Sequence, residues 1–260
     1  MKQFSLQKMR TVKLRERFSV LKNLEFLHDR KRDHRKVAFP ANEISIIAEI
    51  KKASPGNVFN TNADPVRQAT LYEKGGAAAV SVLVDGNFFS GSWKDLNQAS
   101  AAVTVPVLCK EFIYYTEQID MAYYCGADMV LLIAQTLTFT ELETLYAYAR
   151  SRNLMPIVEI NTVKEIDRVL MCGPEYVMVN MRNLNTLAIS IESGIDVLRE
   201  LPDTVTKISA SGISSADDIR RIHDATGTEV FLVGSSLMKS GDPLSSIRAM
   251  RSVLHTAGKQ

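Results

Sequence analysis

Lysine and glutamate side chains stand at the ends of several short apolar runs in this sequence. Glu49 and Lys51 close the first run, Lys110 follows the third, and Glu159 lies near the end of the fifth. Two ammonium groups and two carboxylates in one pocket can divide proton transfers between them, and a positioned cation also stabilises a developing alkoxide. The alternative is that these residues form ordinary ion pairs. Their recurrence on separate runs favours general acid–base chemistry.

Two glycine–serine turns indicate a binding site for a phosphate group. Ser211 and Gly212 follow the seventh apolar run, and Gly234 and Ser235 follow the eighth. Main-chain N–H groups in such turns, with the start of the helix that follows, can hold a phosphate dianion. One such turn alone is a weak signal, whereas two after neighbouring runs are a strong one. Ser54, after the first run, is expected to complete this phosphate cradle.

These side chains need a scaffold that gathers the ends of many strands. From residue 45 onward, β-branched and aliphatic runs alternate with longer segments of helical spacing, the pattern of βα units around a parallel sheet. The chain of 260 residues also has the size of an eightfold barrel. We therefore predict an α/β fold, a (β/α)8 TIM barrel whose site lies at the C-terminal ends of the strands. The predicted strands are residues 45–50, 79–83, 107–109, 129–133, 155–160, 176–179, 206–209 and 230–233.

Residues 1–44 do not share this alternation and are predicted to form an N-terminal helical extension, followed by a single barrel domain over 45–260. Charged helices over 14–28 would lead into an extended linker. The basic run from Arg30 to Lys36 is expected to be a solvated helix end. No stretch reaches the ~18 uninterrupted apolar residues of a membrane span.

Charge and cysteine content narrow the classes of function. The chain has 31 basic and 29 acidic residues, a balance too even to predict binding to nucleic acid or to an anionic membrane. Cys109, Cys125 and Cys172 form no CxxC pair, so neither a disulfide framework nor a zinc site is predicted. We expect a cytoplasmic protein that binds a small phosphorylated molecule. A monomer is expected because no apolar stripe stands out on the outer helices.

At these strand ends the sequence resembles the indole-3-glycerol phosphate synthase family, over roughly residues 45 to 240. The resemblance is carried by six segments, namely Ile47-Ala48-Glu49-Ile50-Lys51-Lys52-Ala53-Ser54-Pro55, Phe88-Phe89-Ser90-Gly91-Ser92, Pro106-Val107-Leu108-Cys109-Lys110-Glu111-Phe112, Gly126-Ala127-Asp128 with Leu131-Leu132-Ile133, Val158-Glu159-Ile160-Asn161, and Gly234-Ser235-Ser236-Leu237-Met238. Together these motifs are highly specific. The resemblance implies a substrate in which an anthranilate ring is joined through nitrogen to a deoxyribulose phosphate. That substrate would be cyclised with loss of carbon dioxide and water, in tryptophan biosynthesis, and no metal or organic cofactor is implied.

The resemblance also implies roles for individual residues. Lys110 would be the general acid that activates the ketone for attack by the ring, and Glu159 would take part in the later proton transfers. Lys51 would bind the substrate carboxylate and supply a proton for dehydration, with Glu49 orienting or balancing it. The remaining implied roles are substrate orientation by Asn180 and Arg182, and phosphate binding by Ser54, Ser211, Gly212, Gly234 and Ser235.

Two further expectations concern the walls and the mouth of the site. Phe89 and Phe112 are candidates for walls around the aromatic ring, although plain core packing explains two phenylalanines equally well. By analogy with the family, the basic N-terminal helix would lie over the mouth of the barrel.

One position departs from the family pattern in a way that bears on catalysis. The family motif after the seventh strand reads Ser-Glu-Ser-Gly-Ile, whereas this chain has Ser209-Ala210-Ser211-Gly212-Ile213. A carboxylate is therefore missing at 210, and losing a positioned catalytic group commonly costs ~10²-fold or more in rate. Three explanations remain open, namely the ordinary reaction at reduced efficiency, the same cyclisation on a modified anthranilate in secondary metabolism, or an engineered substitution.

Two competing functions are weighed against the cyclase. Another phosphosugar barrel, such as an isomerase, would be expected to use a Cys or Asp pair at strand ends, whereas Cys109 should point toward the helices because it precedes Lys110. A non-catalytic barrel that binds a phosphorylated ligand would fit Ala210. Such a binder would have no need of both Lys110 and Glu159, so their presence favours the enzyme.

Overall fold

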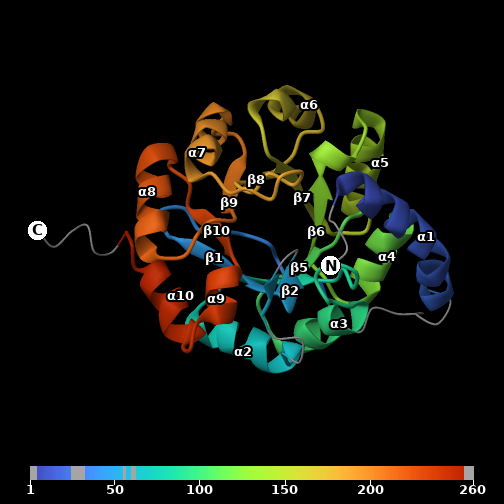
Figure 1. Ribbon diagram of the computed structural model, residues 1–260, viewed down its shortest axis with the longest axis horizontal. Coiled ribbons are helices and arrows are strands. Elements are labelled where there is room, and N and C mark those ends of the chain that lie inside the picture. Colours follow the sequence, from blue (N-terminus) through green and yellow to red (C-terminus); the bar gives the residue numbers. More distant parts are fainter. Residues whose placement is uncertain (1–4, 25–32, 55–56, 60–62, 255–260) are drawn as a thin grey trace, which may run out of the picture.

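The computed structural model describes residues 5–24, 33–54, 57–59 and 63–254. Eight parallel strands close into a barrel, in which the first strand pairs with both the second and the last. Helices surround the strands (Figure 1). The predicted TIM barrel is thus confirmed. The barrel strands are β1 (Ser45–Ile50), β4 (Ala79–Leu83), β5 (Val107–Lys110), β6 (Met129–Ile133), β7 (Met155–Ile160), β8 (Tyr176–Asn180), β9 (Thr206–Ala210) and β10 (Val230–Val233).

Three strands reach one residue further than predicted, while the other predicted bounds coincide with the observed ones. The additional residues are Lys110, Asn180 and Ala210, and each takes part in strand pairing: Leu83 lies opposite Lys110, and Asn180 opposite Ala210. Because they belong to the sheet, the residues at this rim sit on rigid elements.

Several helices begin at residues whose side chains cap the first turn. Thr138 and Glu141 form a reciprocal capping box at the start of α5, and Ser215 caps α8 by accepting a hydrogen bond from the Asp218 N–H. None of the described helices is long and apolar enough to cross a membrane. The barrel helices are α2 (Pro65–Gly75), α3 (Trp93–Ala102), α4 (Thr116–Tyr124), α5 (Phe139–Ser151), α6 (Ile166–Leu170), α7 (Ile191–Glu200), α8 (Ala216–Thr226), α9 (Ser235–Lys239) and α10 (Pro243–Arg251).

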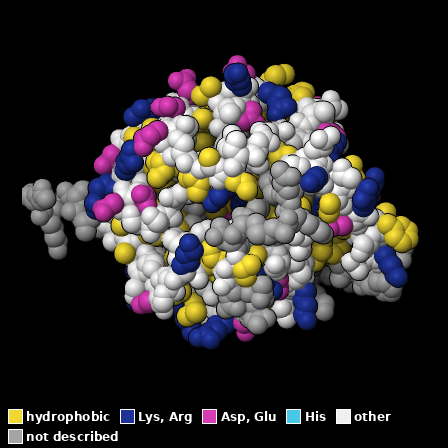
Figure 2. Space-filling model, in the orientation of Figure 1, with side chains coloured by type: hydrophobic (Ala, Val, Ile, Leu, Met, Phe, Trp, Pro, Cys, Tyr) yellow, Lys and Arg dark blue, Asp and Glu magenta, His cyan; other side chains and the backbone are white. Residues whose placement is uncertain are grey.

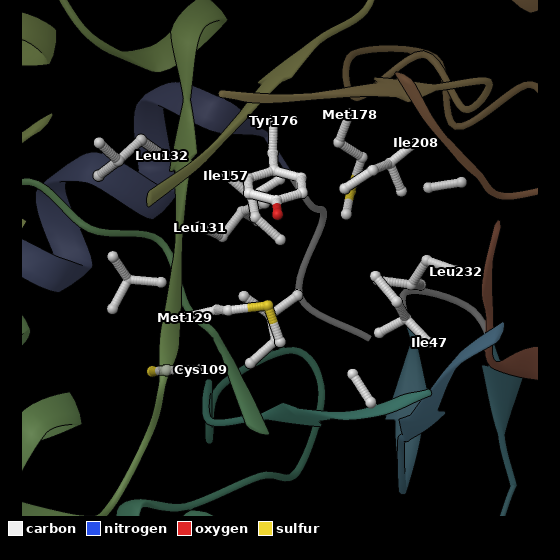
Figure 3. Packing of buried hydrophobic residues seen from close by; sticks show 14 of the residues in the cluster. Ile47, Cys109, Met129, Leu131, Leu132, Ile157, Tyr176, Met178, Ile208 and Leu232 are labelled. Atoms are coloured by element: carbon white, nitrogen blue, oxygen red, sulfur yellow. The ribbon is translucent and has the colours of Figure 1, made fainter. Parts of the chain in front are cut away.

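The barrel interior is packed with apolar side chains from alternating strand positions (Figure 3). Leu131 points toward the centre, whereas its neighbour Leu132 points outward, as the pleat of a strand requires. Cys109 is fully buried, and its sulfur is directed away from the barrel centre. The interior is therefore a solid core, and a ligand can enter only from the ends of the strands.

The N-terminal helix differs from the prediction in both extent and position. It forms α1 (Leu6–Leu24), which starts eight residues before the predicted start, and residues 25–28 of the predicted segment lie outside the described residues. Figure 1 shows α1 beside α4 at the periphery and not over the central strands. The expectation of a helix over the mouth is therefore wrong for the described part of the chain.

The linker after α1 is tied to the barrel by a partly buried arginine. Arg35 donates to the Asp128 carboxylate, both from its backbone N–H and from its side chain, at 2.9 Å in each case. Its guanidinium also donates to the carbonyl groups of Ser100 and Val103. This part of the basic run is therefore an anchor, and not the solvated surface that the run of charges had suggested. After β1 the chain forms a short antiparallel hairpin, β2 (Ala53–Ser54) and β3 (Asn57–Val58).

Candidate active site

A cavity of about 520 Å³ opens at the C-terminal ends of the barrel strands. Figure 2 shows hydrophobic and cationic side chains gathered around a hollow at the centre of the molecule. Every site residue proposed from the sequence lines this cavity, although they come from strands far apart in the chain. These residues are Glu49, Lys51, Ser54, Phe89, Lys110, Phe112, Glu159, Asn180, Arg182, Ser211, Gly212, Gly234 and Ser235.

Glu49 and Lys51 form the first ion pair of the site. They are two residues apart on and just after β1, so both side chains project toward the cavity, and Lys51 Nζ lies 2.7 Å from Glu49 Oε1. Burial disfavours the Glu49 carboxylate, but the ammonium groups of Lys51 and Lys110 outweigh it and hold the pKa of Glu49 below its ordinary value. Glu49 is thus an anion held between two cations.

Lys110 and Glu159 form the second ion pair, with Lys110 Nζ 3.4 Å from Glu159 Oε2. Burial tends to lower the pKa of Lys110, but the carboxylates of Glu159 and Glu49 more than offset this and raise it. Lys110 therefore carries its proton at neutral pH, which a general acid requires. The second Glu159 oxygen accepts a hydrogen bond of 3.0 Å from the Asn180 amide, which fixes the orientation of the carboxylate.

Asn180 connects this pair to the loops after β8 and β9. Its amide oxygen accepts a hydrogen bond of 2.8 Å from the Ser211 hydroxyl and one of 3.1 Å from the Arg182 backbone N–H. The Arg182 side chain donates to the Leu187 carbonyl at 3.1 Å, and burial lowers its pKa. A network therefore runs from the acid–base pair to the residues expected to hold the sugar phosphate.

The phosphate cradle depends on backbone that few residues tolerate. Ser211 and Gly212 both have positive φ, at 71° and 78°, and for the serine this is an uncommon, strained conformation. Gly234 has no such angle but lies so close to Glu49 that a Cβ there would overlap the carboxylate. The first N–H groups of α9 have no partner within that helix, which leaves them able to bind a ligand.

The opposite part of the cavity is apolar. The rings of Phe89 and Phe112 lie 6.2 Å apart between centroids and are tilted by 35°, and both line the cavity. Their position agrees with pocket walls, and Phe112 also belongs to the buried core cluster. Further apolar side chains line other parts of the cavity, namely Leu131, Ile133, Leu184, Leu187 and Ile189, and Ile189 lies beside Gly212.

Ala210 lines the cavity beside Asn180, to which it is paired across β8 and β9. It is the last residue of β9 and is almost fully buried. A longer side chain at 210 would project into the cavity that contains the two lysine–glutamate ion pairs. Position 210, where the resemblance leads us to expect a carboxylate, therefore lines the site.

Sequence reasoning missed several residues that line the cavity. Lys239, in the last turn of α9, lies against the Phe59 ring with Nζ 5.7 Å from the centroid, and Lys51 approaches the same ring at 5.6 Å. The spacing of a lysine one helical turn after Gly234 and Ser235 was a usable signal. Glu111 also lines the cavity, but its carboxylate pairs with Lys13, which no sequence spacing could predict.

Comparison with known proteins identifies the family of this chain. The family model for indole-3-glycerol phosphate synthase matches residues 2–250. The indole-3-glycerol phosphate synthase of Exiguobacterium sibiricum is 39% identical over 82% of this chain and 83% of its own length, and that of Bacillus cereus strain ATCC 14579 is 40% identical over 76% and 79%.

Two solved structures share the fold at low identity. They are a thiamine phosphate pyrophosphorylase from Pyrococcus furiosus, with a TM-score of 0.60 over 84% of this chain and 98% of that one, and a 3-hexulose-6-phosphate synthase, with 0.64 over 81% and 99%. Each is 14% identical, so these similarities concern the barrel alone. The match over nearly the whole length and the two close relatives show that the chain belongs to the indole-3-glycerol phosphate synthase family.

Proposed function

We propose that the cavity binds 1-(2-carboxyphenylamino)-1-deoxyribulose 5-phosphate and closes its indole ring with loss of carbon dioxide and water. The observation that carries this function is the presence of two lysine–glutamate pairs in one cavity that also has an aromatic wall and a phosphate cradle. A phosphate binder without catalysis needs the cradle but not the two pairs. The family to which the chain belongs has the same activity in tryptophan biosynthesis.

The geometry supports one orientation of the substrate. Its phosphate would lie at the loops after β9 and β10, where Ser211, Gly212, Gly234 and Ser235 offer main-chain and hydroxyl donors. Its ring would lie between Phe89 and the other apolar walls. The ring carboxylate would then meet Lys51, at the cost of the present contact between Lys51 and Glu49.

The reaction begins with formation of the carbon–carbon bond. The ring carbon that bears the carboxylate attacks the ketone carbon, and Lys110 gives its proton to the ketone oxygen, which becomes a hydroxyl. The carboxylate then leaves as carbon dioxide, and its bonding electrons restore the aromatic ring. The raised pKa of Lys110 supports this role, because the group is cationic when the alkoxide develops.

Dehydration completes the indole. Lys51 would protonate the new hydroxyl, which leaves as water, while Glu159 would accept the proton released from the adjacent carbon. The low pKa of Glu49 keeps a negative charge beside the Lys51 ammonium group, whose Nζ lies 2.7 Å from Glu49 Oε1. Asn180 would keep Glu159 turned toward the substrate through its 3.0 Å hydrogen bond.

Ala210 leaves this set one carboxylate short of the family pattern, and we infer that it slows ring closure on the ordinary substrate. The alternative is a modified anthranilate-derived substrate in secondary metabolism. Assays with ring-substituted substrates separate these two possibilities.

Indole fluorescence during incubation with the substrate tests the proposal. We expect product from the parent chain, a loss of ~10²-fold or more in Lys110→Ala, and a gain of about tenfold in Ala210→Glu. If neither the parent nor Ala210→Glu forms product while both bind the substrate, the chain does not carry out the ordinary reaction.

Location and assembly are inferred from other features. Cys109, Cys125 and Cys172 are free thiols, which supports a reducing compartment such as the cytoplasm. We infer a monomer, because all of the proposed site residues come from one chain.

A further inference from the structure

Lys13 on α1 is a buried lysine at the rim of the barrel. Only 2% of its side chain is exposed, and its ammonium group contacts three carboxylates. These are Asp85 at 2.7 Å, Glu111 at 3.0 Å and Glu16 at 3.1 Å. Asp85 and Glu111 are themselves buried, and they follow neighbouring strands, β4 and β5. One cation from the N-terminal extension thus joins two strand ends of the barrel.

Each of these two carboxylates also fixes the turn in which it stands. Asp85 accepts a hydrogen bond of 2.7 Å from the backbone N–H of Phe88. Glu111 accepts one of 2.6 Å from the backbone N–H of Phe112. The two turns that Lys13 joins are therefore the turns that carry Phe89 and Phe112, the aromatic walls of the cavity.

Attachment of α1 to the barrel does not depend on Lys13 alone. Arg10 pairs with Glu141 on α5, and Arg17 pairs with Glu117 on α4. Met9 and Val20 of α1 belong to the buried core. Because burying an ammonium group is costly, a further buried lysine is a poor means of docking a helix that already has these contacts.

We propose that Lys13 is a positioning residue that sets the separation of Phe89 and Phe112, and thereby the width of the slot that receives the aromatic ring of the substrate. The inference rests on the proposed function, in which this slot holds the anthranilate ring. It assigns the N-terminal extension a part in ring recognition, although none of its described residues lines the cavity.

The charge balance of the cluster explains why Lys13 matters to both turns. Burial raises the pKa of Glu111 to about 7, Lys13 opposes that rise, and Asp85 adds to it. Without Lys13, no cation would balance the negative charges of the buried Asp85 and Glu111 carboxylates. The two turns would then move apart, or one carboxylate would take up a proton. The other titratable groups around Glu111 are Glu16 on α1, Cys109 on β5, and Tyr114 and Tyr115 before α4.

The ion pairs of Lys13 with Asp85 and Glu111 form an ionic joint between the two turns. The test compares substitutions that remove this joint with one that removes a different contact of α1. Lys13→Met removes the cation. The triple variant Lys13→Met, Asp85→Asn, Glu111→Gln removes the ionic joint but keeps an oxygen to accept each backbone hydrogen bond, so it remains informative if Lys13→Met does not fold. Arg17→Met is the matched control, because it removes an ion pair of α1 with α4 and leaves the joint intact.

Two measurements report on the slot. The first is the affinity for substrate whose ketone has been reduced to an alcohol, followed by the fluorescence of its anthranilate ring, because this molecule binds but cannot be cyclised. The second is the ratio of kcat/KM for a ring-methylated substrate to that for the parent substrate. This ratio does not change with the fraction of enzyme that is folded.

We expect both joint variants to lose about tenfold in affinity and to shift the ratio toward the larger ring, while Arg17→Met changes neither. Unchanged affinity and an unchanged ratio in the triple variant would overturn the inference. Phe89→Ala and Phe112→Ala separate this failure from that of the proposed function. If these two substitutions also leave ring binding unchanged, the slot itself is wrongly assigned. If they weaken ring binding while the Lys13 variants do not, the slot is correct and only the role assigned to Lys13 is wrong.

Discussion

At the scale of the residue, the site is a set of close approaches that sequence spacing only partly reveals. The alternation of β1 predicted that Glu49 and Lys51 share a side, and they lie 2.7 Å apart. The contact of Gly234 with Glu49 was not predictable, because it joins the first and last strands of the barrel. The positive φ of Ser211 was hidden for another reason, since serine carries no signal for that conformation.

The close approach of Gly234 gives a test at this scale. In Gly234→Ala, the added Cβ would overlap the Glu49 carboxylate, which must then move away from Lys51. Because this disturbs one of the two proposed acid–base pairs and the phosphate cradle together, we expect kcat/KM to fall by ~10²-fold. Gly241→Ala is the control, since a Cβ there meets nothing within 4 Å. Equal activity in the two variants would show that the approach has no catalytic importance.

At the scale of the element, the barrel strands were predictable and the N-terminal helix was not. Strands buried on both faces are apolar at nearly every position, so their runs stand out from the helices between them. In α1 the apolar signal is diluted because Lys13 occupies a buried position and its partners lie far along the chain. The helix was therefore predicted too short, and the contacts of its Lys13 with Asp85 after β4 and Glu111 after β5 were missed.

The cluster around Lys13 predicts a pH dependence of folding. The pKa of Glu111 in the folded chain, about 7, lies above the ~4.3 of an unperturbed glutamate. The folded state therefore retains a proton that the unfolded state has lost. The resulting contribution to stability is complete below pH ~4 and is lost as the pH rises toward 7.

Denaturant unfolding of the parent chain and of Glu111→Gln measures this contribution. Between pH 5 and pH 8 we expect the parent to lose more unfolding free energy than the variant, because the variant cannot release that proton. Glu117→Gln serves as control, because the pKa of Glu117 is lowered and its titration lies below this range. The same slope in the parent and in Glu111→Gln would contradict the assignment.

At the scale of the whole molecule, the barrel explains how residues from all parts of the chain meet in one cavity. The fold and the position of the site followed from the alternation of runs and from the polar residues at their ends, whereas the extension did not follow from any repeat. The expectation of a monomer rested on the premise that no apolar stripe lies on the outer helices, and this premise is incomplete. Leu14, Phe18 and Leu21 form an exposed apolar row on α1, with Phe18 79% exposed, so an apolar stripe does exist on this outer helix.

The central claim is that this chain closes the indole ring in spite of Ala210. The most direct measurement is a single turnover with enzyme in excess over the carboxyphenylamino-deoxyribulose phosphate, followed by indole fluorescence and by the mass of the product. The account predicts a slow but complete conversion to a product that has lost one carbon dioxide and one water, and no conversion in Lys110→Ala. Recovery of bound, unchanged substrate from the parent chain would contradict it.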